Sequence, residues 1–187
     1  LTDELKTSLE NAQTLAEVED IYRPYKQKRR TRATVAREKG LAPLAELLLS
    51  PTVTTGTLEE LAAPYVNEKK SVMSTNDALS GAGDIIAETI SDDAAIRAAL
   101  RRLYRTRGEL WSKAATDEDS VYRMYYDYRE PVSRVQGHRV LAVNRGEREG
   151  LLKAGVEIED ALALQEIRRA VFRGISISNA FVNACCE

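Results

Sequence analysis

The chain has 187 residues, of which 43% are apolar and 30% are charged, and it contains only ten Gly and five Pro. This balance indicates one or two ordered domains and excludes a disordered tail, and no apolar run approaches the ~20 residues that a membrane-spanning helix needs. The formal net charge of −2 lacks the basic excess of many nucleic-acid-binding domains, so contacts of that kind would have to come from a local cluster.

Residues 2–21 predict one or two short helices. Thr2 is a candidate N-cap, the acids that follow it suit the positive start of a helix, and apolar residues such as Leu5 and Leu9 recur at roughly helical spacing. Pro24 interrupts this pattern, and the stretch 26–32 has no apolar face, which indicates an exposed loop. Further short helices are expected at 34–39, ending near Gly40, at 41–49 and at 58–63.

Two longer helices are predicted in the middle of the chain. Ser74 begins a capping arrangement for the first helix, although Gly81 and Gly83 weaken its middle. Ser91 caps the second helix, whose apolar stripe extends as far as Ala115.

The last third of the chain predicts helices with one interruption. An aromatic segment at 122–128 is followed by Pro131, which ends an element. Helices are expected from a Ser133 cap and again from Asp160, whereas residues 151–160 have the composition of a short strand. Together these elements predict an all-α fold, a mainly helical and elongated multi-helix array with room for one short β element near 151–160.

Positive charge gathers between Tyr22 and Lys39, where eight Arg or Lys residues face the single acid Glu38. Clustered cations neutralise phosphates and gain from counterion release, and nearby Tyr22 and Tyr25 offer rings on which exposed bases can stack. Interdomain docking and plain solvent exposure are the alternatives for this cluster. The candidate phosphate-binding residues are Arg23, Lys26, Lys28, Arg29, Arg30, Arg32 and Arg37.

Other arginines and the later tyrosines carry weaker signals. For the arginines at 97, 101, 102 and 105, which share one face of a predicted helix, ordinary polar surface is the favoured interpretation. Tyr122, Tyr125, Tyr126 and Tyr128 are interpreted as a packed seam between helices rather than a base-stacking platform. A second-rank basic set comprises Arg134, Arg139, Arg145 and Arg148.

The sequence predicts no catalytic centre, metal site or cofactor. His138 is the only histidine, so neither a catalytic triad with a spare residue nor a multi-histidine metal site can be assembled. Cys185 and Cys186 are adjacent and cannot staple a loop, and residues 1–4 lack a signal-peptide pattern, which together favour a cytoplasmic protein. The start without Met and the end without a helix stop predict a piece of a longer protein.

Three runs resemble the Tex family of bacterial transcription accessory proteins. They read EVEDIYRPYKQKRRTRATVAREKGL at 17–41, YYDYREP at 125–131 and SRVQGHRVLAVNRGEREG at 133–150, in the same order as in that family. The resemblance covers roughly residues 1–160. It implies the mostly helical N-terminal region of a multidomain protein, which continues with a ribonuclease-H-like YqgF domain, helix-hairpin-helix units and an RNA-binding S1 domain.

The resemblance therefore implies that the chain belongs to a nucleic-acid-binding protein, RNA or DNA, that works with the transcription machinery. Residues 1–50 are expected to form a helical segment with the exposed basic loop at about 22–39, and 51–187 the rest of the helical region. Our interpretation is a non-enzymatic helical scaffold with auxiliary phosphate contacts. The alternative is a protein–protein or interdomain docking module that touches no nucleic acid.

Overall fold

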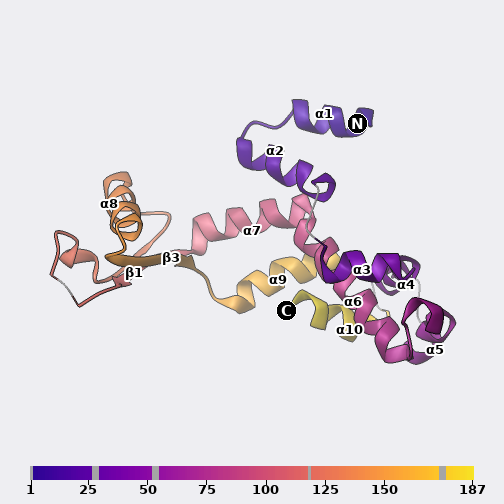
Figure 1. Ribbon diagram of the computed structural model, residues 1–187. Helices are drawn as coiled ribbons and strands as arrows, with labels where there is room; N and C mark the ends of the chain where they lie inside the picture. The colour runs from indigo at the N-terminus through magenta and orange to yellow at the C-terminus, as the bar shows by residue number, and fades with distance from the viewer. Residues whose placement is uncertain (1, 27–29, 52–54, 118, 173–175) are drawn as a thin grey trace. The chain divides into compact units, whose positions relative to one another are not determined.

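The computed structural model describes residues 2–26, 30–51, 55–117, 119–172 and 176–187. Within these ranges the chain is mainly helical and contains one three-stranded antiparallel sheet (Figure 1). The predicted mainly helical fold is confirmed, and so is a strand within 151–160, which is β3 (Leu152–Glu157). No helix in the described ranges is both long enough and apolar enough to cross a lipid bilayer.

The chain divides into two compact units. The helical unit comprises Leu1–Ala98 and Leu164–Glu187, and the sheet unit comprises Ala99–Ala163. The chain enters the sheet unit within α7 (Ala94–Arg107) and leaves it within α9 (Asp160–Val171). Each unit buries apolar residues of its own, such as Ile86 in the helical unit and Val143 in the sheet unit.

The helical unit begins with a pair of short helices, α1 (Asp3–Glu10) and α2 (Leu15–Tyr22). The Thr2 hydroxyl accepts the Leu5 N–H at 3.3 Å, which confirms the predicted cap, and Thr14 begins α2 with a complete capping box. Neither helix buries an apolar side chain in the described structure, and the only buried residue of α2 is Asp20. This pair therefore has no hydrophobic core of its own.

Short elements follow the predicted break at Pro24, which lies in the 3-10 turn η1. Gly40 has a φ of +85°, a left-handed conformation that ends the preceding helix as predicted. The bounds of these elements are η1 (Arg23–Tyr25), α3 (Arg32–Glu38), α4 (Ala42–Leu49), α5 (Leu58–Ala62), η2 (Ala63–Tyr65) and η3 (Glu68–Lys70).

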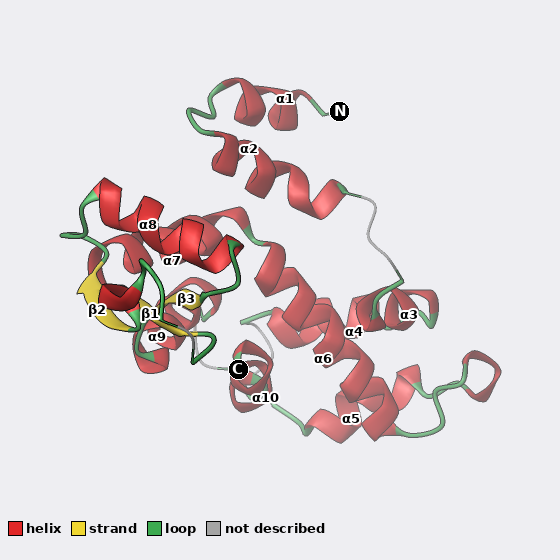
Figure 2. Ribbon diagram, turned by 60° about the vertical axis from the view of Figure 1, so that its left-hand side comes forward, coloured by secondary structure: helices red, strands yellow, loops and turns green. Residues whose placement is uncertain are grey.

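The helix α6 (Thr75–Asp92) is the centre of the helical unit, since α3, α4, α5 and α10 all contact it (Figure 2). Its predicted cap is confirmed, because the Ser74 hydroxyl accepts the Asp77 N–H at 3.1 Å. The core includes Leu44 and Ile86, both fully buried. Gly81 lets α6 approach its neighbours closely, since a Cβ there would lie 2.4 Å from Cδ1 of Leu41.

The chain ends in α10 (Asn179–Cys186), which packs on α6. Val182 is buried at this contact, and the buried Ser178 hydroxyl donates to the Leu48 carbonyl at 2.6 Å. A hydroxyl withdrawn from water needs such a partner, so this bond ties the last helix to α4.

The predicted helix from Ser91 to Ala115 is wrong at both ends. The cap is Asp93, whose carboxylate accepts the Ile96 N–H at 2.8 Å, and the helix α7 stops at Arg107. After Gly108 the chain forms the strand β1 (Glu109–Ala114), in which Leu110 and Ser112 are buried alternately with exposed or half-buried neighbours. The apolar residues of this stretch fit the spacing of a helix as well as the alternation of a strand. Pairing with two other strands makes this stretch a strand.

β1 is the central strand of the sheet, in the order β2-β1-β3. The missed strand β2 (Asp127–Pro131) ends at the proline that was predicted to stop an element. Trp111 stands opposite Arg129 on one side and Gly155 on the other.

The helix α8 (Gly137–Arg148) packs against β3. It begins four residues later than the predicted Ser133 cap, because Val135 N–H donates to the Pro131 carbonyl in a turn that precedes the helix. The four tyrosines of the aromatic segment are packed, as predicted. They lie, however, in the 3-10 turn η4 (Arg123–Tyr125), beside it and in β2, and they pack with Val143 and Leu152 instead of between two helices.

Candidate nucleic-acid interface

The basic segment, residues 23–39, spans η1, a connection and α3. Of the predicted phosphate-binding residues, Arg23 lies in η1, Lys26 follows it, Arg30 precedes α3, and Arg32 and Arg37 lie on α3. Lys28 and Arg29 lie outside the described residues. Lys26 and Arg30 lie outside the helices, as the predicted loop requires, and both side chains are exposed.

An acidic row on α6 faces the basic segment. Its members recur every fourth residue, a spacing that places them on one side of the helix. Each pairs with one arginine of the basic segment: Asp84 with Arg32 (3.3 Å), Glu88 with Arg37, and Asp92 with Arg23 (3.0 Å). Much of the positive charge is therefore balanced within the helical unit.

Two pairs of this row, Asp92 with Arg23 and Glu88 with Arg37, are more buried than the third, and we call them the inner pairs. The Asp92 side chain is only 12% exposed, and that of Glu88 is similarly covered, so removing Arg23 or Arg37 would strand a poorly solvated carboxylate. The Arg32 side chain is 89% exposed, and exposed pairs contribute little to stability. Arg23 and Arg37 thus have a structural role, while Arg32 retains a guanidinium open to solvent.

In a further ion pair the acid lies on the early helix α2 and the cation lies on α7. Arg97 Nε of α7 donates to the Asp20 carboxylate of α2 at 2.6 Å, and Asp20 is 4% exposed. The α2–η1 stretch therefore offers an acid to Arg97 and a cation to Asp92. These crossed ion pairs attach α2 to α7 and η1 to α6, and no described residue of α1 or α2 adds a buried apolar side chain.

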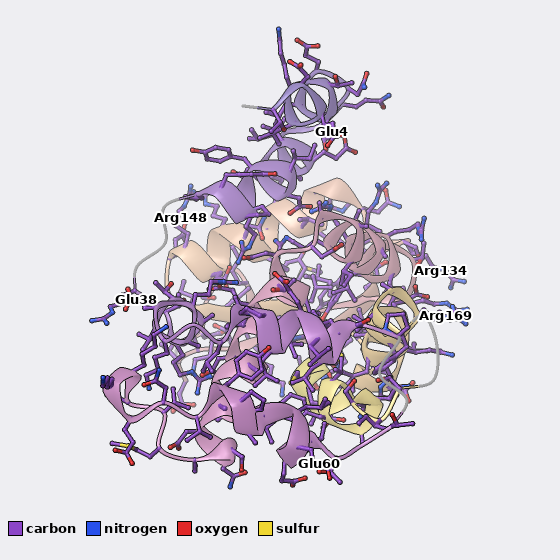
Figure 3. All side chains as sticks on the ribbon, turned by 90° about the vertical axis from the view of Figure 1, so that its right-hand side faces the viewer. Glu4, Glu38, Glu60, Arg134, Arg148 and Arg169 are labelled. Atoms are coloured by element: carbon purple, nitrogen blue, oxygen red, sulfur yellow. The ribbon has the colours of Figure 1, made fainter. Side chains whose placement is uncertain are left out.

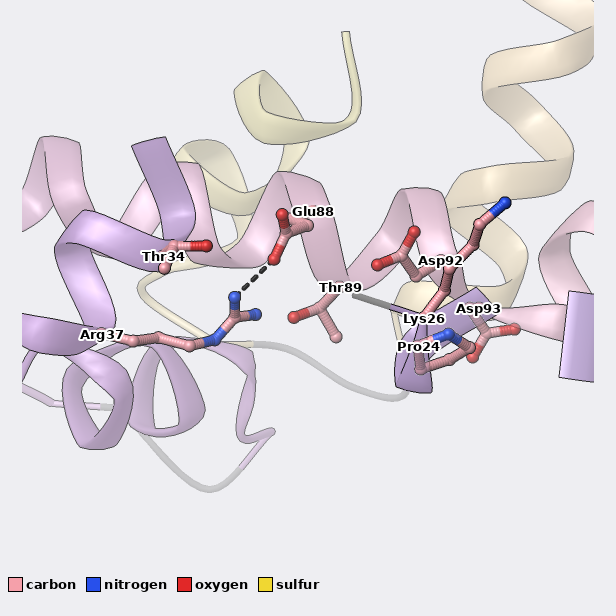
Figure 4. A pocket seen from close by; sticks show the side chains of 8 residues that line it. All are labelled: Pro24, Lys26, Thr34, Arg37, Glu88, Thr89, Asp92 and Asp93. Carbon is pink, nitrogen blue, oxygen red and sulfur yellow. Dashed lines mark hydrogen bonds and ion pairs between the residues drawn. The ribbon is translucent and has the colours of Figure 1, made fainter. Parts of the chain in front are cut away.

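A pocket of about 620 Å³ lies beside the inner pairs (Figure 4). Glu88, Asp92 and Asp93 line it together with Arg37, and Figure 4 shows the Lys26 ammonium directed away from the two aspartates. A phosphate entering here would meet carboxylates as well as cations, so the pocket is a poor anion site. No cluster of three or more His, Cys, Asp or Glu side chains in the described ranges is placed to hold a metal ion.

Within the described part of the basic segment, we call three exposed side chains the outer cations: Lys26, which also borders this pocket, Arg30 and Arg32. Arg30 donates to Glu38 at 2.9 Å, an exposed pair on the same segment, and Glu38 projects outward in Figure 3. A guanidinium has five N–H donors, so one carboxylate contact leaves donors for a phosphate. The outer cations can therefore reach a phosphate without breaking a buried pair.

The second-rank basic set separates in the same way. Arg139 donates to Glu130 at 2.8 Å, and Arg145 donates to Glu149 at 2.9 Å. Hydrogen bonds from Tyr128 and Arg139 hold the pKa of the Glu130 carboxyl below its usual value. Arg134 and Arg148 are exposed, and Arg134 lies at the edge of the molecule in Figure 3.

The arginine face predicted on the middle helix is also divided. Arg97 belongs to the crossed ion pairs, whereas Arg102 and Arg105 are exposed. The sequence interpretation missed the acidic row altogether. The four-residue spacing of Asp84, Glu88 and Asp92 was visible in the sequence, but the predicted Ser91 cap assigned Asp92 to the next helix, whereas α6 continues to Asp92.

The two cysteines lie in the last turn of α10 and are free thiols. Burial raises the pKa of Cys185 to about 11, so this thiol is a weak nucleophile at neutral pH. His138 is exposed in the first turn of α8.

Comparison with known proteins identifies the relatives of this chain. A family model described as Tex central region-like matches residues 54–181, and so extends past residue 160. The chain is 48% identical over 161 residues to the uncharacterized protein YdcI of Bacillus subtilis, covering 84% of the chain and 22% of YdcI. It is 35% identical over 162 residues to the transcriptional accessory protein Tex of Neisseria gonorrhoeae, covering 85% of the chain and 21% of that protein.

A more distant relative carries an RNA-binding name. The S1 RNA-binding domain-containing protein 1 of Pongo abelii is 28% identical over 163 residues, covering 81% of the chain and 16% of that protein. The chain thus spans about a fifth of the length of the relatives it matches.

Proposed function

The chain belongs to the Tex family, and we propose that it serves there as a helical scaffold whose outer cations make auxiliary contacts to nucleic-acid phosphates. The parent protein is proposed to be a cytoplasmic, nucleic-acid-binding accessory factor of transcription. Two relatives, the Neisseria gonorrhoeae accessory protein and the Pongo abelii S1 protein, support this proposal through their names.

The observation that carries the proposal is the division of the basic segment. Arg23 and Arg37 hold η1 and α3 against α6 through poorly exposed carboxylates, while the outer cations are exposed, including Arg32 in its pair with Asp84. Phosphates attract such cations through charge and counterion release, and neither effect requires a shaped pocket. The inner pairs fix where the outer cations stand, so scaffold and contact are parts of one arrangement.

The second candidate is a docking module, and one observation favours it. Leu141 lies on α8 and is 71% exposed, and Arg145 and Arg148 follow it at spacings of four and seven, which place them on the same face of the helix. A large apolar residue rimmed by cations is typical of a contact with an acidic protein surface. Under this alternative the basic residues meet other domains or the transcription machinery and no nucleic acid.

We propose that the chain has no catalytic activity of its own. Two observations support this proposal: Glu88 and Asp20 are paired with arginines, and burial leaves Cys185 a weak nucleophile at neutral pH. Metal-dependent turnover of RNA or DNA by the isolated chain would contradict this part of the proposal.

A fluorescence-anisotropy titration tests the phosphate contacts. Labelled single-stranded RNA, single-stranded DNA and duplex DNA are titrated at several salt concentrations with the 187-residue chain and with the variant K26A/R30A/R32A. Three lost phosphate contacts lower the slope of log affinity against log salt by up to about 2 for a single strand. The matched control is K69A/R123A/R169A, which removes the same charge from exposed positions elsewhere, two of them in exposed ion pairs.

Weaker, less salt-sensitive binding in the first variant but not in the control is the expected result. Equal losses in both variants would mean that net charge alone governs binding. An absence of binding by the folded chain would leave the docking alternative.

A further inference from the structure

Tyr22 and Tyr25 are exposed in a way that the packed tyrosines are not. Their residues are 49% and 60% exposed, and within the described structure their hydroxyls make no hydrogen bond. By contrast, the Tyr122 hydroxyl donates to Glu149 and that of Tyr126 to Ser120, each at 2.9 Å. The first two rings are therefore not accounted for by a core or by a polar network.

The 3-10 turn explains why the two rings share one side. Tyr22 is the N-cap of η1 and Tyr25 its last residue, and side chains three residues apart nearly eclipse in a 3-10 helix. Together with Thr2 and Leu5 of the α1 region they line a concave site of about 300 Å³, which we call the aromatic site. Its volume is at the lower end of small-molecule sites and suits a single planar ring.

The residues between the two rings are engaged elsewhere. Arg23 donates to Asp92, and Pro24 lines the separate pocket that holds the inner pairs. The two rings thus line the aromatic site, while Arg23 donates to Asp92 and Pro24 lines the pocket beside the inner pairs. This arrangement leaves the faces of the two rings available to a ligand.

Charge decides which ligand fits the aromatic site. Lys26 follows Tyr25 directly and begins the outer cations, so a polyanion is favoured on that side. The helices on the other side carry exposed acids, including Asp3, Glu4 and Glu19, which repel a polyanion. A chain of phosphates that leaves the aromatic site is therefore favoured toward the outer cations and disfavoured toward the acids of α1 and α2.

We infer that the aromatic site binds an unpaired base of a single-stranded nucleic acid whose phosphates run along the outer cations. The inference rests on the proposed phosphate contacts and adds the preference for a single strand. Stacking on an aromatic ring tolerates any base sequence, and it requires a base that is free of a duplex.

The test separates stacking from phosphate contact. The 187-residue chain is titrated with a fluorescein-labelled twelve-nucleotide oligothymidylate, with the same oligonucleotide carrying abasic spacers in place of its inner bases, and with a twelve-base-pair duplex. One stacked base corresponds to about fivefold or more in affinity, so the oligothymidylate is expected to bind at least that much more tightly than the abasic strand.

Variants place this difference on the two rings. Y22L/Y25L keeps apolar side chains against Leu5 and is expected to bind both strands equally, at the level of the abasic strand, with an unchanged salt slope. Y22F/Y25F keeps the rings and is expected to bind like the unmodified chain. The control is Y104L, an exposed tyrosine of α7.

The opposite results are also distinct. Equal binding of the two strands by the unmodified chain, or full affinity in Y22L/Y25L, would overturn the stacking site while leaving the phosphate contacts intact, and the latter result would fit a protein partner at this site. Failure of Y22F/Y25F to bind like the unmodified chain would also overturn it. If the unmodified chain shows no salt-dependent binding, or if K26A/R30A/R32A binds as tightly as the unmodified chain, the proposed function and this inference both fail.

Discussion

Replacing Asp84 with Asn is expected to strengthen nucleic-acid binding, because Asp84 competes with phosphate for Arg32. The pair is 3.3 Å long and the Arg32 side chain is 89% exposed, so it belongs to the exposed class worth roughly 0.2 to 1 kcal/mol. Relief of that competition corresponds to a gain of about 1.4- to 5-fold in affinity for single-stranded DNA. The helix itself should be little affected, since Asp and Asn have similar helix propensity.

The assay is an anisotropy titration at about 50 mM and about 300 mM salt, and the gain should fade at the higher concentration as screening increases. Glu59→Gln on α5 is the matched control, since it removes one exposed negative charge outside the acidic row. An unchanged affinity in Asp84→Asn, or an equal gain in the control, would refute the reasoning that Arg32 is shared between Asp84 and phosphate.

Three further predictions concern the structure that carries the outer cations. In urea denaturation, Gly81→Ala should lower the free energy of unfolding by a net of about 1 to 2 kcal/mol, because its Cβ would meet the buried Leu41 at 2.4 Å. Gly83→Ala should raise the free energy of unfolding by about 0.5 to 1 kcal/mol, since its nearest neighbour lies at 3.4 Å. Shifts of the same sign would show that α6 is packed differently. Arg97→Ala should speed hydrogen exchange in α1 and α2 by about tenfold or more, because the buried Asp20 loses its paired guanidinium, and should leave exchange in the middle of α6 unchanged. Exchange rates in α1 and α2 that are the same in the variant and the unmodified chain would argue against the crossed ion pairs. Alkylation of Cys185 should be slow at pH 8 and accelerate up to its pKa of about 11, and a plateau below pH 9 would contradict the burial of this thiol.

The helical part of the fold was predictable from local signals. Thr2 and Ser74 cap helices as expected, and Gly40 ends one, because capping and left-handed glycine depend on a few neighbouring residues. The error at β1 has a different origin. Its two apolar residues, Leu110 and Trp111, extend a helical stripe as readily as they alternate in a strand, and only pairing with β2 and β3 settles the choice.

The candidate interface was predictable as a cluster and not as an arrangement. The density of Arg and Lys between 23 and 39 is visible in the sequence, but the roles of Arg23, Arg32 and Arg37 depend on partners more than fifty residues away. Arg23 and Arg32 look alike in the sequence, yet one pairs with a covered carboxylate and the other lies open to solvent. The difference arises from the position of α6, which no local pattern contains.

The most direct test of the central claim is a cross-linking map. Single-stranded RNA containing 4-thiouridine is bound to the 187-residue chain, irradiated, and the cross-linked peptides are identified by mass spectrometry at low and moderate salt. The account predicts cross-links concentrated on residues 22–32, at the outer cations and the aromatic site, and lost as salt increases. Cross-links concentrated on α8 or spread evenly over the chain would contradict it.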